Sequence, residues 1–468
     1  MIRVSLCGAA GEVTGSGYLL ESPRSQVLVD FGVFQGGSDA RARSRELGPV
    51  DPGRLNAAVL THAHIDHSGR MPLLYARGYR GAVVATPATL ALTPILLEDL
   101  ARLDIEWVTK LNRARQRAGK ELLQPIYAPE DVRHMHQRVR ALGYGTQREV
   151  AAGFSLRFHE AGHIMGSASV ALTVKDGSES KVIVFSGDLG PRGVPILRDP
   201  EPPAEADAVF LESTYGGRER APQEDTVEAF KRILEGAAGN GERVLIPAFA
   251  VGRSQLILYY LAEAVREGRL PRDFPIILDS PMAARATEAL IRHPEVLDSE
   301  ARELASRRQF SKDLAGLRVT ASARESAALN ESGEPCVILS ASGMCEGGRI
   351  VHHLRHNLWR PKVNVVLVGY MVERSLGRQL ADGEKLVQIF GEDVVVRARV
   401  HVLDGFSAHA GHAELLDWLG GIRGRDANAP RVILTHGEDP ERAALAAAIE
   451  QRFGVTAERP ERGAVISI

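Results

Sequence analysis

The amino-acid sequence predicts an α/β protein of two or three domains, and three observations support this prediction. Short runs of β-branched and aliphatic residues recur along the chain and end in a polar or acidic residue, which is typical of buried strands that present reactive groups at their carboxyl ends. In the middle of the chain these runs alternate with helical patterns, as in a parallel sheet. A length of 468 residues is sufficient for more than one core.

The first part of the chain contains three of these runs, each followed by a residue that can bind a metal or a proton. They lie at residues 27–29 before Asp30, 57–60 before His62, and 182–185 before Asp188. A more charged stretch, residues 90–140, has no strand-like alternation, and we expect it to form a helical insertion on the surface.

The middle of the chain repeats this layout and adds helices between the strands. Strand-like runs lie at residues 209–211, 244–246, 276–278 and 337–339, and helical patterns at 226–234 and 254–265. Because proline stiffens the chain, the proline-rich segment 199–203 predicts a linker near residue 205. We expect a first domain over 1–206, an inserted parallel-sheet α/β domain over 207–385, and a return to the first domain over 386–468.

The composition excludes several classes of protein. A charged fraction of 25% and a net charge of −2 argue against disorder and against a chain that is basic all over. If the protein binds nucleic acid, its positive charge must be concentrated in a local patch. Cys7, Cys336 and Cys345 have no CxxC spacing, which does not support a disulfide framework or a cysteine-built zinc site. With no leader-like start and no run of ~20 apolar residues, we expect a soluble, cytoplasmic protein without a membrane partner.

The string His62-Ala63-His64-Ile65-Asp66-His67 places four potential metal ligands in six residues directly after a strand-like run. Imidazole and carboxylate are the ligands of a zinc site that keeps a position open for water, whereas structural sites more often use cysteine. The string therefore predicts a catalytic metal centre. One loop cannot surround two ions, and further ligands are available after other strands, at His163, Asp188 and His436.

These motifs, in this order, resemble those of a known family. Asp30, the histidine string, His163 and Asp188 resemble the successive motifs of the metallo-β-lactamase fold. Glu212, His409 and His436 resemble the three extra motifs of its β-CASP subgroup of nucleic-acid hydrolases, and the similarity spans essentially the whole chain. The resemblance implies a metallo-β-lactamase αββα sandwich with an inserted β-CASP domain. The relatives it indicates are bacterial and archaeal ribonucleases akin to the nuclease subunit of the cleavage and polyadenylation specificity factor.

The resemblance also implies a cofactor, a substrate and a set of ligands. It implies two Zn²⁺ per chain, RNA as the substrate and, by family likeness alone, a homodimer. One zinc would be bound by His62, His64 and His163 and the other by Asp66, His67 and His436, with Asp188 bridging them. Asp30 would fix the histidine loop, as groups behind metal ligands generally do. Histidine at position 436 favours RNA, because DNA-repair members carry an aliphatic residue there.

The expected reaction is hydrolysis of a phosphodiester. Two cations ~3.5–4 Å apart can activate a water and neutralise the charge that develops on the phosphate. The leaving alkoxide needs a proton, which a histidine stabilised by a carboxylate can supply at neutral pH. The resemblance assigns this role to His409 with Glu212 as its partner, and we count Asp66 and Asp188 as catalytic groups too.

Three glycine-containing loops of the middle segment are candidates for binding the phosphate backbone, because glycine lets backbone amides approach phosphate oxygens. Their candidate substrate-binding residues are Arg253, Ser342, Gly343, Arg349, Ser375 and Arg378. The arginines would supply a local basic surface on a neutral protein. We interpret the nearby string His352-His353-Leu354-Arg355-His356 as a polar helix face.

Three alternatives remain open at the level of sequence. A DNA nuclease would share most of the motifs, and His436 is the evidence against it. A non-catalytic RNA-binding scaffold would lack several ligands, whereas this chain has them all. A thioester or lactam hydrolase would share the histidine loop but has no use for the arginine-bearing insertion. Internal and 5′-end-dependent cleavage use the same motifs, so the sequence does not choose between them.

Overall fold

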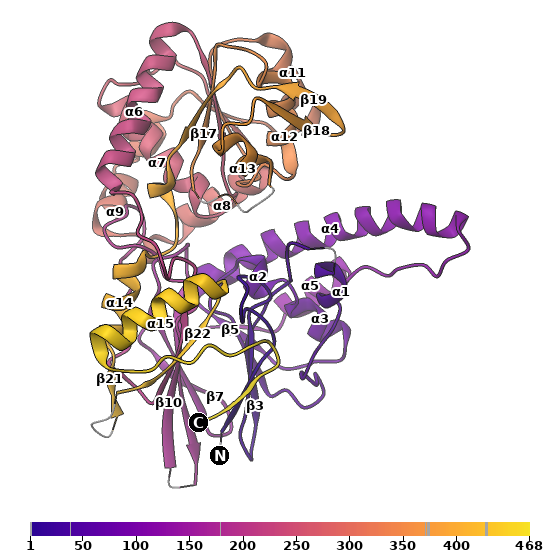
Figure 1. The fold of residues 1–468 in the computed structure, drawn as a ribbon, viewed down its shortest axis with the longest axis vertical. Coiled ribbons are helices and arrows are strands. Elements are labelled where there is room, and N and C mark those ends of the chain that lie inside the picture. The colour runs from indigo at the N-terminus through magenta and orange to yellow at the C-terminus, as the bar shows by residue number, and fades with distance from the viewer. Residues whose placement is uncertain (1, 38, 178, 370, 372–374, 426–428) are drawn as a thin grey trace. The chain divides into compact units, whose positions relative to one another are not determined.

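The computed structural model describes residues 2–37, 39–177, 179–369, 371, 375–425 and 429–468. Two compact units account for these residues. The first comprises Met1–Arg192, Asp199–Glu219 and His409–Ile468, and the second Gly193–Arg198 and Arg220–Ala408. Both units combine helices with sheets (Figure 1).

Two sheets form the centre of the first unit. The seven-stranded sheet has the order β23 (Val465–Ser467), β1 (Arg3–Leu6), β2 (Gly17–Glu21), β3 (Gln26–Phe31), β4 (Ala57–Val59), β5 (Val83–Ala85) and β6 (Val139–Ala141). The six-stranded sheet has the order β22 (Arg431–Thr435), β12 (Ala208–Glu212), β10 (Glu179–Phe185), β9 (Ala168–Asp176), β8 (Phe154–Glu160) and β7 (Gln147–Ala151). A short parallel pair joins β11 (Glu205–Ala206) to β21 (Arg423–Gly424).

The core between these two sheets consists of side chains from both. Val4, Leu20 and Val29 of one sheet belong to the same buried cluster as Phe158 and Phe185 of the other. The alternation of buried and less buried residues along β8 shows why: every second side chain points into this layer. A sandwich of two sheets follows.

Helices cover the outer faces of the sandwich. On the side of the seven-stranded sheet, a second buried cluster includes residues of the helices α3, α4 and α5; on the other side, a third includes residues of α14 and α15. The helices are α1 (Ala40–Arg43), α2 (Ile65–Ser68), α3 (Met71–Ala76), α4 (Pro87–Arg117), α5 (Pro129–His136), α14 (His412–Gly420) and α15 (Asp439–Phe453). The first unit is thus the expected αββα sandwich.

The second unit has a parallel sheet with helices on both faces. The strand order is β15 (Leu317–Val319), β14 (Ile276–Asp279), β16 (Val337–Ser340), β13 (Arg243–Pro247), β17 (Val363–Leu367) and β20 (Arg399–Val402). A separate hairpin pairs β18 (Leu386–Ile389) with β19 (Glu392–Val395). The helices are α6 (Gln223–Asn240), α7 (Arg253–Arg266), α8 (Pro281–Arg292), α9 (Ser299–Ser306), α10 (Gln309–Asp313), α11 (Ala323–Ser332), α12 (Gly348–Asn357) and α13 (Leu376–Ala381), with 3-10 turns η1 (Pro294–Val296) and η2 (Asp404–Phe406).

The units divide later along the chain than the boundaries expected at 206 and 385. The proline-rich segment leads into β12, which still pairs with β10 and β22 of the first unit. Likewise β20, which lies beyond residue 385, still pairs with β17 of the second unit. Among the residues that the structure describes, none of the helices combines the length and the apolar run that a membrane crossing requires.

Candidate metal centre

The histidine loop follows β4 and is fastened from behind by Asp30, at the end of the neighbouring strand β3. The Asp30 carboxylate accepts hydrogen bonds from the Thr61 amide (2.8 Å), the Thr61 hydroxyl (2.7 Å) and Nδ1 of His67 (2.8 Å). Asp30 is fully buried. Because Nδ1 of His67 is engaged with this carboxylate, Nε2 is the nitrogen left to face the centre of the site.

The end of β3 and the short helix α2 lie in direct contact, and a glycine permits this. A Cβ atom at Gly32 would lie 1.6 Å from the carbonyl oxygen of Asp66. On the same side, the Ser16 amide donates a hydrogen bond to that carbonyl at 2.9 Å. The backbone of the loop is therefore fixed at Asp66, which lies in the sequence between the predicted ligands His64 and His67.

The seven predicted ligands lie together in two groups that share Asp188. The first group is His62, His64, His163 and Asp188, and the second is Asp66, His67, Asp188 and His436. Within each group the candidate ligand atoms all lie within 4.8 Å of one another. Loops that are distant in sequence therefore place all seven side chains close together.

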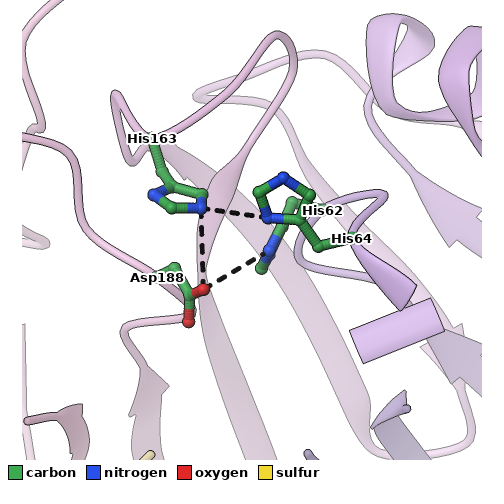
Figure 2. A group of neighbouring side chains, drawn as sticks. All are labelled: His62, His64, His163 and Asp188. Atoms are coloured by element: carbon green, nitrogen blue, oxygen red, sulfur yellow. Dashed lines mark hydrogen bonds and ion pairs between the residues drawn. The ribbon is translucent and has the colours of Figure 1, made fainter. Parts of the chain in front are cut away.

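Asp188 directs one carboxylate oxygen to each group. Its Oδ2 lies 3.5 Å from Nε2 of His62 and 3.6 Å from Nε2 of His163, which in turn lies 3.1 Å from Nδ1 of His64 (Figure 2). Its Oδ1 lies 3.1 Å from Nε2 of His67 and 3.5 Å from Nδ1 of His436. Each oxygen of the Asp188 carboxylate therefore faces a different group of donor atoms.

Two buried polar atoms at the centre lack a hydrogen-bond partner among the described residues: Nε2 of His62 and Oδ1 of Asp188. Leaving buried polar atoms unpaired is costly, and native proteins do so where a ligand or ion completes the bonding. The donors are imidazole and carboxylate, without cysteine, which is the set of a catalytic zinc site. The residues present thus fit metal ions.

The protonation states of His62, His64 and Asp66 favour metal binding at neutral pH. Burial lowers the pKa of His64 to about 4 and, with the charge of His67, lowers the pKa of His62 well below its usual range. Both imidazoles are therefore neutral, with a lone pair available. Burial alone would raise the pKa of Asp66, but the hydrogen bond with His436 and the charge of His67 outweigh it and lower the pKa to about 2.

Charge pairing has the opposite effect on His67. Burial would lower its pKa, but the carboxylates of Asp188 and Asp30 outweigh burial and raise the pKa well above its usual range. The same attraction, from His436 and His67, holds the pKa of Asp188 well below its usual range although burial opposes it. The negative charges at the centre thus attract any cation, proton or metal.

His409 lies beside the first group, with Glu212 behind it. Nδ1 of His409 lies 3.3 Å from Oε1 of Glu212, and the His409 ring centre lies 4.6 Å from that of His163. Glu212 ends β12 and is held by the amides of Leu189 (2.8 Å) and Thr214 (3.2 Å). Burial would lower the pKa of His409, but the Glu212 carboxylate outweighs it and raises the pKa. The pair can hold a proton next to the candidate ligands.

In the second unit, the three glycine-containing loops follow the adjacent strands β16, β13 and β17 and contact one another. A Cβ atom at Gly343 would lie 2.8 Å from the ring of Phe249, over which Arg253 also lies. A Cβ atom at Gly369 would lie 1.9 Å from the Arg253 guanidinium, and the Gly377 amide donates to the Met344 carbonyl at 3.3 Å. The loops therefore form one surface.

The candidate substrate-binding residues on this surface differ in how far they are already engaged. Arg349 donates to Asp279 Oδ1 (2.7 Å) and to Thr320 Oγ1 (2.9 Å). Ser375 is buried and caps α13 by accepting from the Arg378 amide at 3.1 Å. The Arg378 guanidinium pairs with Asp382 at 2.9 Å. Ser342 is half-buried in the loop after β16.

Sequence reasoning missed several polar residues that hold the site. Thr61 lies between Asp30 and the histidine loop, and Thr214 Oγ1 lies 3.1 Å from Nδ1 of His436. Thr61 directly precedes the histidine string, and Thr214 lies two residues after Glu212. Their position next to these motifs is the signal that could have indicated them. His353 is not part of a polar helix face as expected: it is fully buried, with Nε2 2.6 Å from Asp279 and Nδ1 2.9 Å from Asn330.

Comparison with known protein families covers most of the chain. Residues 10–247 match the metallo-β-lactamase superfamily, residues 254–380 the β-CASP domain, and residues 393–460 the Zn-dependent metallo-hydrolase RNA specificity domain. The first of these matches contains the histidine loop, His163, Asp188 and Glu212, and the last contains His409 and His436.

Individual relatives are similar over nearly the full length. The protein named Ribonuclease TTHA0252 of Thermus thermophilus is 44% identical, over 95% of this chain and 95% of its own. The transcription termination factor FttA of Thermococcus kodakarensis is 32% identical, over 98% of this chain and 70% of its own. A crystal structure of a protein of unknown function from Enterococcus faecalis has the same fold, with a TM-score of 0.56, 14% identity and full coverage of both chains.

Proposed function

This chain belongs to the β-CASP group of the metallo-β-lactamase superfamily, and we propose that it is a ribonuclease that uses two zinc ions to hydrolyse RNA phosphodiester bonds. The family resemblance of its motifs is thereby confirmed. The chain is a metal-dependent hydrolase of a nuclease family, with a match to an RNA specificity domain and relatives named for RNA cleavage and transcription termination.

The observation that carries the proposal is the position of Asp188, whose two oxygens face two different groups of nitrogen and oxygen donors. His62, His64 and His163 would hold one zinc, and Asp66, His67 and His436 the other, with Asp188 bound to both. The absence of cysteine from both groups supports a catalytic role, because closed structural sites mostly use thiolates.

When bound, the two zinc ions would lower the pKa of water and neutralise charge on the phosphodiester. The chain's own groups would then handle the proton of the leaving alkoxide. His409 would donate this proton, because its side chain is partly exposed and its raised pKa favours the protonated form. Glu212 would stabilise the protonated imidazole and fix its orientation through Nδ1.

RNA is the proposed substrate because histidine stands at position 436 and because the carboxyl-terminal part of the chain matches an RNA specificity domain. In the second unit, the converging loops of Arg253, Ser342, Gly343 and Arg378 would bind the phosphate backbone. Arg349 and Ser375 would support these loops from within. We also expect a homodimer, which light scattering would detect.

The test compares RNA with DNA of the same sequence, each linear and circular, on zinc-loaded protein. We expect cleavage of RNA with little cleavage of DNA. Equal or faster cleavage of DNA contradicts the assignment to RNA, and opening of circular RNA establishes internal cutting. An Asp188→Ala variant should lose zinc and activity, whereas Asp273→Ala, at an exposed aspartate of the second unit, should retain both.

A further inference from the structure

The outer end of helix α4 and the turn that follows it, residues 107–120, are strongly basic. This segment contains five basic residues and no acidic one, in a chain whose net charge is −2. The five are Lys110, Arg113, Arg115, Arg117 and Lys120, of which only Arg115 is half-buried and the others are exposed. None of them forms an ion pair with a residue that the structure describes. From this segment, named here the basic arm, we infer a second RNA-binding surface that grips the phosphate backbone away from the metal centre.

Three of these residues form one stripe along the helix. Lys110, Arg113 and Arg117 are spaced by three and four positions, which places them on one face with axial separations of about 4.5 and 6 Å. Like charges at these spacings destabilise a helix by a few tenths of a kcal/mol per pair. The helix dipole favours basic residues only in the last turn, and Lys110 lies before it. Glu106, four positions before Lys110, pairs with Arg102 at 2.9 Å. The like charges of the stripe therefore do not contribute to the stability of α4.

The arm is held in shape by hydrogen bonds that leave the stripe exposed. The Asn112 side chain donates to the carbonyl of Leu123 at 2.8 Å and accepts from its amide at 2.9 Å, which fastens the returning chain to the helix. Arg115 Nε donates to the Glu121 carbonyl at 2.6 Å. Gly119 has a left-handed φ of 63° and allows the helix to turn back. A polyanion would thus meet a preformed surface.

The other end of the same helix contacts the loop that carries His163. The hydroxyls of Thr86 and Thr89 both donate to the carbonyl of Gly166, at 2.6 and 2.7 Å. From Thr86 to Lys110 the helix rises about 36 Å. Within the first unit, α4 extends well beyond α3 and α5 (Figure 1). One helix, which contains Pro94 in its first part, thus joins the loop of His163 to the basic arm, and this fits RNA that continues outward from the site of cleavage.

The ligand class follows from the charge pattern. Trp107 is the one aromatic residue of the basic arm, and the Arg41 guanidinium lies over its ring at 3.8 Å from the ring centre. The stripe itself therefore presents guanidinium and ammonium groups, which provide sequence-independent contacts to phosphates. The partner is therefore an RNA backbone, and the inference rests on the proposed ribonuclease function. It predicts that the basic arm contributes to the binding of long RNA but not to the binding of short RNA that contacts only the metal centre.

The test is RNA binding by the zinc-loaded protein as a function of salt, measured by fluorescence anisotropy with 2′-O-methyl RNA of about 5 and about 30 nucleotides. The variant is Lys110→Ala/Arg113→Ala/Arg117→Ala. The matched control, Arg24→Ala/Arg77→Ala/Arg459→Ala, removes the same charge from exposed arginines outside α4. Alanine favours helix, so circular dichroism and the melting temperature of the arm variant should match the wild type.

For single strands each phosphate contact contributes about −0.7 to the slope of log K against log salt. For long RNA, we expect the arm variant to make the slope of log K against log salt less negative by about 2 and the control variant to leave this slope unchanged. Both variants should bind short RNA like the wild type. An unchanged slope in the arm variant, or an equal change in the control, overturns the inference. A wild type that binds the long 2′-O-methyl RNA but cleaves no unmodified RNA overturns the proposed function, while the slopes still test the arm. A wild type that binds no RNA overturns both.

Discussion

Replacing Asp30 with asparagine removes one buried negative charge from behind the histidine loop with almost no change in volume. The asparagine carbonyl can retain the hydrogen bond from the Thr61 amide. Its NH₂ group then takes the place of the oxygen that accepts from the Thr61 hydroxyl and from Nδ1 of His67. The threonine hydroxyl can reverse its role, but the His67 bond to a carboxylate is lost.

The size of the effect follows from that one bond. A hydrogen bond to a charged group contributes about 1.5–3 kcal/mol. Removing the partner of a metal-binding histidine typically weakens metal binding by about 10–100-fold, which corresponds to about 1.4–2.7 kcal/mol. Both figures agree, and we expect Asp30→Asn to weaken binding of zinc at the group that contains His67 by this factor.

Competition with a chromogenic chelator measures the zinc affinity, and a matched variant controls for general damage. Asp279 of the second unit is also buried and accepts hydrogen bonds from Ser326 and His353, both at 2.6 Å. Asp279→Asn should lower the melting temperature and leave zinc affinity unchanged. Unchanged affinity in Asp30→Asn, or an equal loss in Asp279→Asn, would refute the positioning role of Asp30.

Three further predictions concern the proton donor, the loop and the metals. Glu212→Gln removes the charge that raises the pKa of His409; since a general acid acts only when protonated, the fall of kcat/KM at high pH should move to lower pH, and an unmoved profile contradicts the pairing. Gly32→Ala, whose Cβ would lie 1.6 Å from the Asp66 carbonyl, should lower the free energy of unfolding by about 1–3 kcal/mol in urea titrations, whereas Gly143→Ala, with open space around it, should not. Chelation should lower the melting temperature, because zinc at 100 times its Kd stabilises by about 2.7 kcal/mol; an equal melting temperature with and without chelator counts against bound metal.

Much of the fold could be predicted from local pattern. All seven strand-like runs coincide with strands, from β3 to β16, with only Leu60 beyond the end of its strand, and the two helical patterns lie in α6 and α7. The stretch predicted as a helical insertion contains α4 and α5. These elements are set by the period of hydrophobic residues, which the sequence displays directly. The αββα sandwich itself came from the family motifs and is confirmed.

What the sequence could not predict depends on contacts between distant residues. Arg349 was expected at the phosphate surface, but the structure bonds it to Asp279, 70 positions away. His353 belongs to the same network and is buried, although His352 and His356 of the same string are exposed. Thr214 reaches His436 across 222 positions. Such pairings arise from strand order and not from local periodicity, so only the folded chain reveals them.

The central claim is that two zinc ions, held by two donor groups that share Asp188, are needed together for RNA cleavage. Adding zinc stepwise to metal-free protein while measuring the initial rate of RNA cleavage tests this claim directly. The account predicts little activity up to the first equivalent of bound zinc and a rise to the full rate as the second binds. Full activity with one bound zinc, or activity unaffected by its complete removal, would contradict it.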